Sequence, residues 1–186
     1  MAISTVTEQD RVKALHQLLI LDSPYETLFD SIVKAASDIC EKPIALISLV
    51  DENRQWFKAK VGLPSEVTQT PREYAFCAKT ILSNEILEVM DASQDDRFFD
   101  NPLVTGDPNI RFYAGFPITM PAGENIGTVC VIDSKPGGLN LYQRKALQGL
   151  SDITSKALTA RLVSLKMYHH THLEDPLVSE LIPVEA

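Results

Sequence analysis

The sequence predicts an α+β domain: one antiparallel sheet with helices on one face and at the ends. Two observations carry this prediction. Neighbouring strand segments are joined by turns so short that the strands must run antiparallel. Apolar residues at helical spacing flank the strand segments near both ends of the chain. With 186 residues, of which 45% are hydrophobic, the chain suits one domain with a full core.

Two helices are expected before the first strand. Thr7 followed by Asp10 predicts the capped start of a short helix. Ser23, Pro24 and Glu26 predict a capping box for a second helix, with the proline at the first helical position. The apolar stripe of the second helix comprises Leu28, Phe29, Ile32, Val33, Ala36, Ile39 and Cys40.

A hairpin is expected next, formed by residues 44–50 and 54–61. The first segment is apolar nearly throughout, which is typical of a strand covered on both faces. The second segment alternates, which predicts two different faces. These faces are Phe57, Ala59 and Val61 on one side, and Trp56, Lys58 and Lys60 on the other.

The middle of the chain predicts a helix, a short strand and a long loop. Residues 70–73, Thr-Pro-Arg-Glu, repeat the capping-box pattern and predict a helix of about three turns. Residues 86–90 predict a strand, and residues 91–109 an irregular loop rich in Asp, which is typical of a binding loop or a lid. The carboxylates around Arg97 indicate caps and an ion pair, because a calcium loop needs regular ligand spacing and a Gly turn.

The last third of the chain predicts two strands and one long helix. IRFYAGFPI, residues 110–118, alternates and predicts a strand with two faces; residues 126–132 predict its partner after a turn. Asn140 and Gln143 predict a capping box for a helix from Leu141 to about Met167, which is longer than the sheet needs.

These elements divide the chain into three parts. Residues 1–21 form an N-terminal helix, residues 22–167 form the domain together with its long last helix, and residues 168–186 form a flexible tail.

Composition excludes several classes of protein. The net charge of −8 argues against unspecific binding to nucleic acid and against docking on an anionic membrane. Cys40, Cys77 and Cys130 are too few and too scattered for a disulfide framework. The amino terminus does not read as a signal peptide, and no apolar run approaches the roughly 20 residues that span a bilayer. We therefore expect a cytoplasmic protein.

Four ordered blocks carry a family resemblance: PIALISLVDENRQWFKAKVGL, EYAFCAKTIL, NPLVTGDPNIRFYAGFPI and IGTVCVIDS. They resemble GAF domains, most of all those preceding histidine-kinase or diguanylate-cyclase modules in bacterial signalling proteins, over residues 21–163. The resemblance implies a central antiparallel sheet with the first and last helices packed together on one face. It implies a ligand pocket on the other face, roofed by the mid-chain helix and the long loop. It also implies a homodimer formed through the terminal helices.

The resemblance leaves the ligand, and therefore any cofactor, unknown. The Asn-Lys…Phe…Asp-Glu pattern of cyclic-nucleotide GAF domains is not found here. Bilin-binding GAF domains commonly have His after the attachment Cys, whereas Cys77 is followed by Ala78. Strand residues facing the roof would supply the walls of the pocket. The candidate ligand-binding residues are Trp56, Phe76, Cys77, Arg111, Tyr113 and Asp133.

The sequence leaves two possible roles for Arg111. Its guanidinium could bind a ligand carboxylate or phosphate in bidentate fashion, or it could form an ion pair with an Asp of the preceding loop. We expect the ion pair, because the loop before Arg111 is long and rich in Asp.

Thiol chemistry at Cys77 is the one enzymatic possibility that the sequence offers. Cys77 stands near the start of a predicted helix, where the pKa of a thiol can be lowered. GAF proteins that reduce free methionine sulfoxide use cysteines in this region with a second, resolving thiol, and that spacing is not reproduced. We expect Cys77 to be a core residue. No catalytic base and no metal site are expected, because the histidines lie outside the predicted pocket elements. They are His16, His169, His170 and His172.

The sequence therefore predicts a stand-alone, non-enzymatic GAF sensor or regulatory module in bacterial signal transduction. It would bind a small ligand or a partner protein, and it would act through that partner as a homodimer. Two alternatives stay open. One is a thiol-dependent enzyme like the free methionine sulfoxide reductases, and the other is a degenerate scaffold whose own side chains fill the pocket.

Overall fold

The structure is a computed structural model that describes residues 6–173. It is the predicted α+β fold, with a six-stranded antiparallel sheet in the order β3-β2-β1-β6-β5-β4. No helix in the described part of the chain is long and apolar enough to cross a membrane. The elements are α1 (Glu8–His16), α2 (Thr27–Cys40), β1 (Ile44–Val50), β2 (Arg54–Val61), β3 (Gln69–Pro71), the 3₁₀ turn η1 (Arg72–Tyr74), α3 (Phe76–Thr80), β4 (Leu87–Val89), η2 (Ala92–Gln94), α4 (Pro102–Thr105), β5 (Phe112–Thr119), β6 (Asn125–Asp133) and α5 (Leu141–Leu173).

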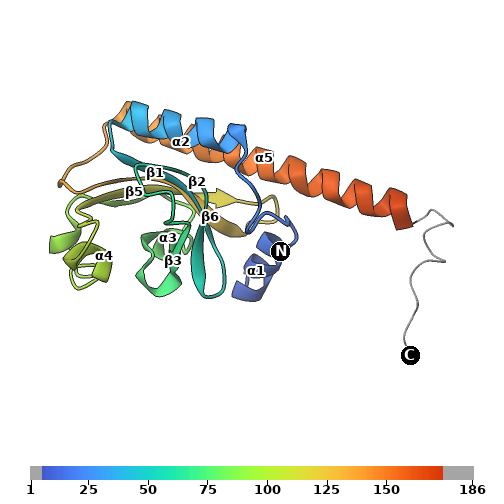
Figure 1. Ribbon diagram of the computed structural model, residues 1–186, viewed down its shortest axis with the longest axis horizontal. Helices are drawn as coiled ribbons and strands as arrows, with labels where there is room; N and C mark the ends of the chain where they lie inside the picture. The colour runs from blue at the N-terminus through green and yellow to red at the C-terminus, as the bar shows by residue number, and fades with distance from the viewer. Residues whose placement is uncertain (1–5, 174–186) are drawn as a thin grey trace, which may run out of the picture.

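The sheet separates two hydrophobic cores. Helices α2 and α5 lie side by side on one face, called the helix face below, and α3 and α4 lie on the opposite face, called the pocket face (Figure 1). The core of the helix face includes Leu15, Phe29, Ile47, Phe112, Val129 and Leu158. The core of the pocket face includes Leu46, Phe57, Phe76, Phe98, Tyr113 and Cys130.

The stretch that alternates in IRFYAGFPI forms most of β5, which lies between β6 and β4. Phe112 and Ala114 belong to the helix-face core and Tyr113 to the pocket-face core, so both faces of the strand are buried. The ladder with β6 shifts register between Ile118 and Thr119, just after Pro117, which has no N–H to donate.

Strand β2 departs from strict alternation. Ile47 pairs with Ala59 and Ser48 pairs with Phe57, so Lys58 is an extra residue in a β-bulge. The bulge moves Ala59 and Val61 to the helix face with Trp56, and leaves Phe57 on the pocket face. The predicted faces of this strand are therefore wrong, because one inserted residue reverses the alternation that follows it.

Lys58 explains why the predicted capping box at residues 23–26 does not form. Its side chain is fully buried, and its Nζ contacts Ser23 Oγ at 2.9 Å, Pro24 O at 2.6 Å and Glu26 Oε1 at 2.7 Å. The residues expected to cap α2 hold this ammonium group instead. Helix α2 consequently begins at Thr27, after Glu26, without a side-chain cap.

Glu26→Gln is expected to destabilise the protein by about 2 kcal/mol, because the buried ammonium group of Lys58 would lose its anionic partner. The value lies below that for a fully buried pair since Glu26 is 42% exposed. Urea denaturation measures it. The control is Asp38→Asn, which breaks the exposed pair with Lys34 in the same helix and should cost less than about 0.5 kcal/mol. Equal losses in both variants would contradict this role of Lys58.

The predicted capping box at residues 70–73 is also wrong. Thr70 lies opposite Gln55 in the β2–β3 ladder, and its hydroxyl accepts a hydrogen bond from Gln55 Nε2 at 3.0 Å. Pro71 is tolerated because β3 is an edge strand. Helix α3 therefore begins later, at Phe76, and has five residues rather than three turns.

The capping boxes at both ends of the domain form as predicted. Thr7 and Asp10 cap α1 reciprocally. Asn140 and Gln143 exchange backbone-to-side-chain hydrogen bonds of 3.0 and 2.9 Å at the start of α5. Helix α5 continues to Leu173, beyond the predicted end near Met167. The rest of the predicted tail, residues 174–186, lies outside the described residues.

Candidate functional site

A cavity of about 360 Å³ opens on the pocket face, between the sheet and the segments that cover it. Strands β1, β2, β5 and β6 form its floor, and α3 and the loops after β2 and before β5 form its walls. Most of the lining is apolar: Ile44, Leu46, Phe57, Leu63, Pro64, Val67, Phe76, Leu103, Pro108, Ile110, Tyr113 and Ile132. Asp107 is the one charged residue among the described lining residues.

Three of the six candidate residues line this cavity: Phe76, Cys77 and Tyr113. Trp56 lies in the core of the opposite face, because β2 presents it toward the helices. Asp133, at the end of β6, contacts Lys42 at 3.5 Å and accepts a hydrogen bond from the N–H of Lys135, outside the cavity lining.

Arg111 holds the long loop before β5 by hydrogen bonds. Its Nη1 donates to the carbonyl oxygens of Val104 at 2.9 Å and of Ile110 at 3.0 Å. The predicted function of holding the loop therefore fits, but the partners are backbone carbonyls and not an Asp. The predicted ion pair of Arg97 forms with Asp95, at 2.6 Å.

Aromatic stacking holds the long loop before β5 against α3. The rings of Phe76 and Phe98 stack with centroids 4.0 Å apart, and Tyr113 lies against Phe76 at 5.1 Å. Asn101 also donates to the carbonyl oxygen of Tyr74 at 3.0 Å. The roof is thus packed on the sheet, and the cavity lies beside this aromatic group.

Gln55, a lining residue, has an unsatisfied polar atom buried beside the cavity. Its side chain lines the cavity and the residue is only 5% exposed. Its Nε2 donates to Thr70, while Oε1 is buried without a hydrogen-bond partner. A buried acceptor left without a partner is costly, so a ligand N–H or O–H at this position would remove a penalty. Sequence reasoning missed Gln55, since only the β2–β3 pairing reveals it.

A polar cluster lies at the inner end of the cavity around Cys77. The hydroxyl of Thr128 donates to Cys77 Sγ at 3.0 Å, and the hydroxyl of Tyr113 does so at 3.4 Å. Tyr113 Oη also lies 2.7 Å from Thr80 Oγ1. Cys130 Sγ, 53 residues further along the chain, lies 3.9 Å from Cys77 Sγ. The sequence predicts that Cys77 is a core residue but gives no sign that it meets Cys130.

The surroundings of Cys77 determine how readily it ionises. Burial opposes loss of the proton, but hydrogen bonds from Cys130, Thr128 and Tyr113 to the sulfur outweigh it and lower the pKa of Cys77 to about 7. By contrast, burial raises the pKa of Cys40, in α2, to about 11. Cys77 is therefore the cysteine most disposed to react as a thiolate.

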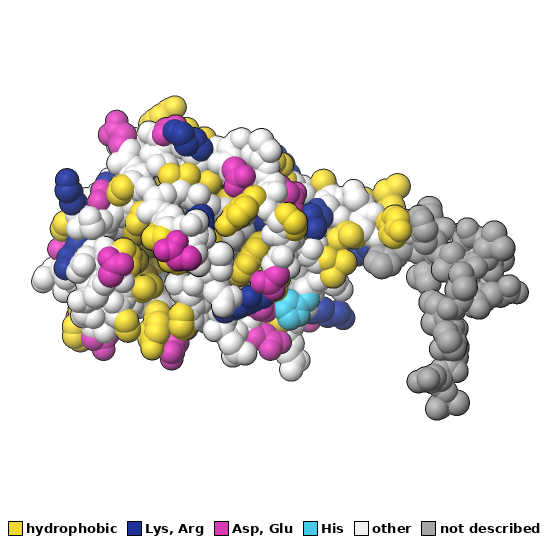
Figure 2. All heavy atoms as spheres, viewed as in Figure 1, with side chains coloured by type: hydrophobic (Ala, Val, Ile, Leu, Met, Phe, Trp, Pro, Cys, Tyr) yellow, Lys and Arg dark blue, Asp and Glu magenta, His cyan; other side chains and the backbone are white. Residues whose placement is uncertain are grey.

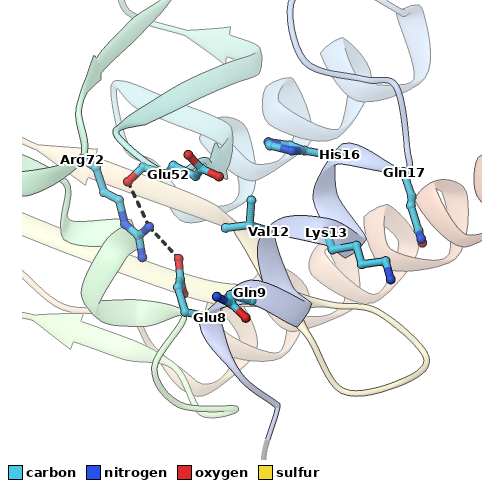
Figure 3. A pocket seen from close by; sticks show the side chains of 8 residues that line it. All are labelled: Glu8, Gln9, Val12, Lys13, His16, Gln17, Glu52 and Arg72. Carbon is cyan, nitrogen blue, oxygen red and sulfur yellow. Dashed lines mark hydrogen bonds and ion pairs between the residues drawn. The ribbon is translucent and has the colours of Figure 1, made fainter. Parts of the chain in front are cut away.

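A second, wider hollow lies between α1 and the β1–β2 turn (Figure 3). Figure 3 shows Glu8 reaching from α1 to Arg72, where Glu8 Oε1 accepts from Nη1 at 2.7 Å. Arg11 also donates to both carboxylate oxygens of Glu8, at 2.8 and 2.6 Å. The Glu8 carboxylate, shared by Arg11 and Arg72, thus links α1 to the segment after β3.

Glu8→Gln is expected to remove an acid-sensitive part of the stability. Hydrogen bonds from Arg11 outweigh desolvation and, with Arg72, lower the pKa of Glu8 from 4.5 to about 2. The folded pKa is below the unfolded one, so this stabilisation is present above about pH 4.5 and is lost as the pH falls toward 2. The urea midpoints of wild type and variant should therefore converge over this range. A gap that stays constant down to about pH 3 would contradict the assignment.

The comparison with known proteins identifies the family. The model of the GAF domain family matches residues 24–158. A cyclic di-GMP phosphodiesterase of Pseudomonas aeruginosa is 47% identical over 131 residues, which are 70% of this chain and 22% of that protein. The chain thus spans under a quarter of the length of this curated relative.

Solved structures show the same fold at low sequence identity. The GAF domain of an Acinetobacter phosphoenolpyruvate-protein phosphotransferase has a TM-score of 0.57 at 18% identity, over 86% of this chain and 97% of that chain. A type II free methionine-R-sulfoxide reductase from Thermoplasma acidophilum has a TM-score of 0.52 at 13% identity, over 74% and 96% of the two chains.

The antiparallel sheet, with paired helices on one face and a cavity on the other, defines an α+β domain with the GAF fold. The chain belongs to the GAF domain family.

Proposed function

We propose that this GAF domain is a non-enzymatic sensory module that binds a small, largely apolar ligand in the cavity on the pocket face. The observation that carries the proposal is the buried Gln55 Oε1, which lacks a partner in an otherwise apolar lining. An apolar cavity with a few directed polar groups is typical of small-molecule sites.

The charges of the cavity define the class of ligand. Among the described lining residues there is no Lys, Arg or His, and Asp107 contributes a negative charge. A phosphate or carboxylate in the cavity would therefore be desolvated without a cationic partner, which is costly. We infer an uncharged or cationic ligand with an N–H or O–H donor directed at Gln55.

The same charges bear on the enzymatic alternative. The Cys77–Cys130 pair favours thiol chemistry, as in the free methionine sulfoxide reductase with the same fold. Free methionine sulfoxide, however, carries a carboxylate, for which the described lining offers no cation. An assay of methionine sulfoxide turnover, with Cys77→Ser as control, decides between them. Turnover that depends on Cys77 would replace the sensory proposal with an enzymatic one.

The degenerate scaffold is the second alternative. Phe76, Phe98 and Tyr113 pack together under the roof, as that alternative requires. The adjoining cavity of about 360 Å³ is nevertheless large enough for a small organic molecule, within the range of ligand sites. This volume favours the sensory proposal over the scaffold.

We further propose that α5 carries the signal through a homodimer. The side chains that α5 buries against the sheet end at Leu158, although the helix has 33 residues and a length of about 50 Å. Its last part projects past the sheet in Figure 1, and Figure 2 shows hydrophobic side chains along it. Ile153 and Val163 are 48% and 51% exposed. A second copy packed along α5 would cover them.

Val163→Glu is expected to weaken dimerisation by at least about tenfold, because the carboxylate would be desolvated in the helix–helix contact. Sedimentation velocity or light scattering measures it. Ser164→Glu is the matched control, since Ser164 is also exposed and adds the same charge beside Val163. A monomeric wild type, or equal behaviour of the two variants, would contradict the α5 interface.

The relative from Pseudomonas aeruginosa suggests a setting for this module. That relative is named as a cyclic di-GMP phosphodiesterase, and this chain spans 22% of its length. The match therefore supports a regulatory role in cyclic di-GMP signalling rather than catalysis by this domain. The cavity is poorly suited to cyclic di-GMP itself, which carries two phosphates. Three free cysteines fit a cytoplasmic, reducing location.

Native mass spectrometry tests whether the purified protein retains a ligand. A folded mass above the sequence mass, which returns to it on denaturation, would support the proposal. Ile132→Trp, designed to fill the cavity, is the control and should carry no such adduct. An adduct that persists in this variant would place the bound molecule elsewhere.

A further inference from the structure

Two thiols from distant parts of the chain meet at the inner end of the cavity. Cys77 lies in the short helix α3 and Cys130 in the central part of β6, and their Sγ atoms are 3.9 Å apart. The residues are 2% and 0% exposed, but Cys77 contributes to the cavity lining. Cys77 is therefore the thiol of the pair that borders the cavity, and Cys130 is its neighbour outside the lining.

The groups around the pair suit a reactive sulfur better than a packing role. Thr128 and Tyr113 both direct hydroxyl hydrogens at Cys77 Sγ. The buried hydroxyl of Ser48, opposite Thr128 in the β1–β6 ladder, has no other partner and also contributes to lowering the pKa of Cys77. A cysteine that only fills space needs no such donors, whereas a thiolate is stabilised by them.

We propose that Cys77 and Cys130 are a peroxide-responsive dithiol, in which a small uncharged hydroperoxide enters the cavity and converts the two thiols to a disulfide. The apolar, cation-free lining admits a neutral oxidant such as hydrogen peroxide without requiring a binding site for charge. This inference does not depend on the resident ligand of the proposed sensory function.

The chemistry balances in two steps. The Cys77 thiolate attacks one oxygen of the peroxide, the O–O bond breaks, and the second oxygen leaves as water or an alcohol after taking a proton. Cys77 is then a sulfenic acid. The sulfur of Cys130 attacks the Cys77 sulfur, the S–O bond breaks, and the hydroxide leaves as water with the proton of Cys130. The two thiols lose two electrons, which reduce the peroxide; a cellular dithiol would restore them by thiol–disulfide exchange.

Disulfide formation would alter the cavity wall. The two sulfur atoms would approach from 3.9 Å to about 2.05 Å, which draws α3 toward β6. The thiolate acceptor of Thr128 and Tyr113 would disappear at the same time. Oxidation would thus change the same wall that a ligand contacts.

To test this, the reduced protein is treated with hydrogen peroxide, and the remaining thiols are blocked in denaturant with iodoacetamide. Mass spectrometry then maps the peptides. We expect a Cys77–Cys130 disulfide peptide, with Cys40 still alkylated and at least about tenfold slower to oxidise, because its thiol is far less ionised. Cys40→Ser should form the same disulfide. In Cys130→Ser, Cys77 should stop at a sulfenic acid that dimedone traps.

Two results would overturn the proposal. One is a wild type in which Cys77 and Cys130 stay unlinked while Cys40 oxidises at a similar rate. The other is oxidation of Cys77 directly to sulfinic or sulfonic acid without a disulfide. The wild-type peptide map decides the matter even if Cys130→Ser fails to fold. Failure of the ligand proposal would leave this map unchanged, so the two outcomes are distinguishable.

Discussion

Gly127→Ala is expected to destabilise the domain by at least about 4 kcal/mol, a large part of the stability of a single domain. Gly127 lies in β6 between Leu49 of β1 and Ile118 of β5. A Cβ on Gly127 would lie 2.2 Å from the carbonyl oxygen of Ser48 and 3.0 Å from Leu49 Cα. These are backbone atoms of the central strand, so the clash can be relieved only by forcing the β1–β6 ladder apart.

Gly149→Ala is the matched control for this prediction. Gly149 lies in α5, and a Cβ there would have no atom within 4 Å. The same substitution should therefore stabilise the protein by about 0.5–1 kcal/mol through helix propensity. Urea denaturation of both variants gives the comparison. A loss below about 1 kcal/mol for Gly127→Ala would show that the strands are not packed as described.

Gly115→Ala is expected to disrupt the polar cluster at the inner end of the cavity and to cost about 2–4 kcal/mol. A Cβ on Gly115 would lie 2.3 Å from Tyr113 Oη and 3.1 Å from Cys130 Cβ. The Tyr113 ring would have to move toward the cavity, which breaks its hydrogen bond with Thr80. In the stretch IRFYAGFPI, the absence of a side chain at Gly115 therefore leaves the space that the Tyr113 hydroxyl occupies.

A comparison with Tyr113→Phe separates the loss of the Tyr113 hydroxyl from the displacement of its ring. Removing only the hydroxyl should cost about 1 kcal/mol and leave the ring in place. The double variant Tyr113→Phe/Gly115→Ala should recover part of the loss from Gly115→Ala, because the closest atom is gone. Strict additivity in this double-mutant cycle would contradict the placement of Tyr113 over Gly115.

Local signals in the sequence were reliable where nothing distant competed with them. The capping boxes at Thr7 and Asn140 form because their partners are three residues away and exposed. The similar patterns that begin at Ser23 and Thr70 fail because distant side chains, those of Lys58 and Gln55, take these hydroxyls. A tertiary contact overrides a local motif here.

The candidate site was predictable only in part for the same reason. Phe76, Cys77 and Tyr113 lie on the pocket face, where the family resemblance suggested them, and their role in ligand binding stays a prediction. Trp56 was misplaced, and the contact of Cys77 with Cys130 was missed. A bulge and a pairing between segments 53 residues apart leave no periodic trace in the sequence.

A methyl-labelled NMR titration tests the central claim, that the cavity is a site for a small ligand without negative charge. The probe is indole, which is apolar and has one N–H donor for Gln55. We predict that indole shifts the methyl signals of Ile44, Leu46 and Ile132 around the cavity, but not those of Ile32 and Leu147 on the helix face.

Two controls sharpen this titration. Gln55→Leu, or 1-methylindole in place of indole, should weaken binding about tenfold by removing the hydrogen bond. Cyclic AMP, which carries a phosphate, should leave the cavity methyls unshifted. If the methyl signals around the cavity do not shift with indole, or shift with cyclic AMP instead, the result would contradict this account of the cavity.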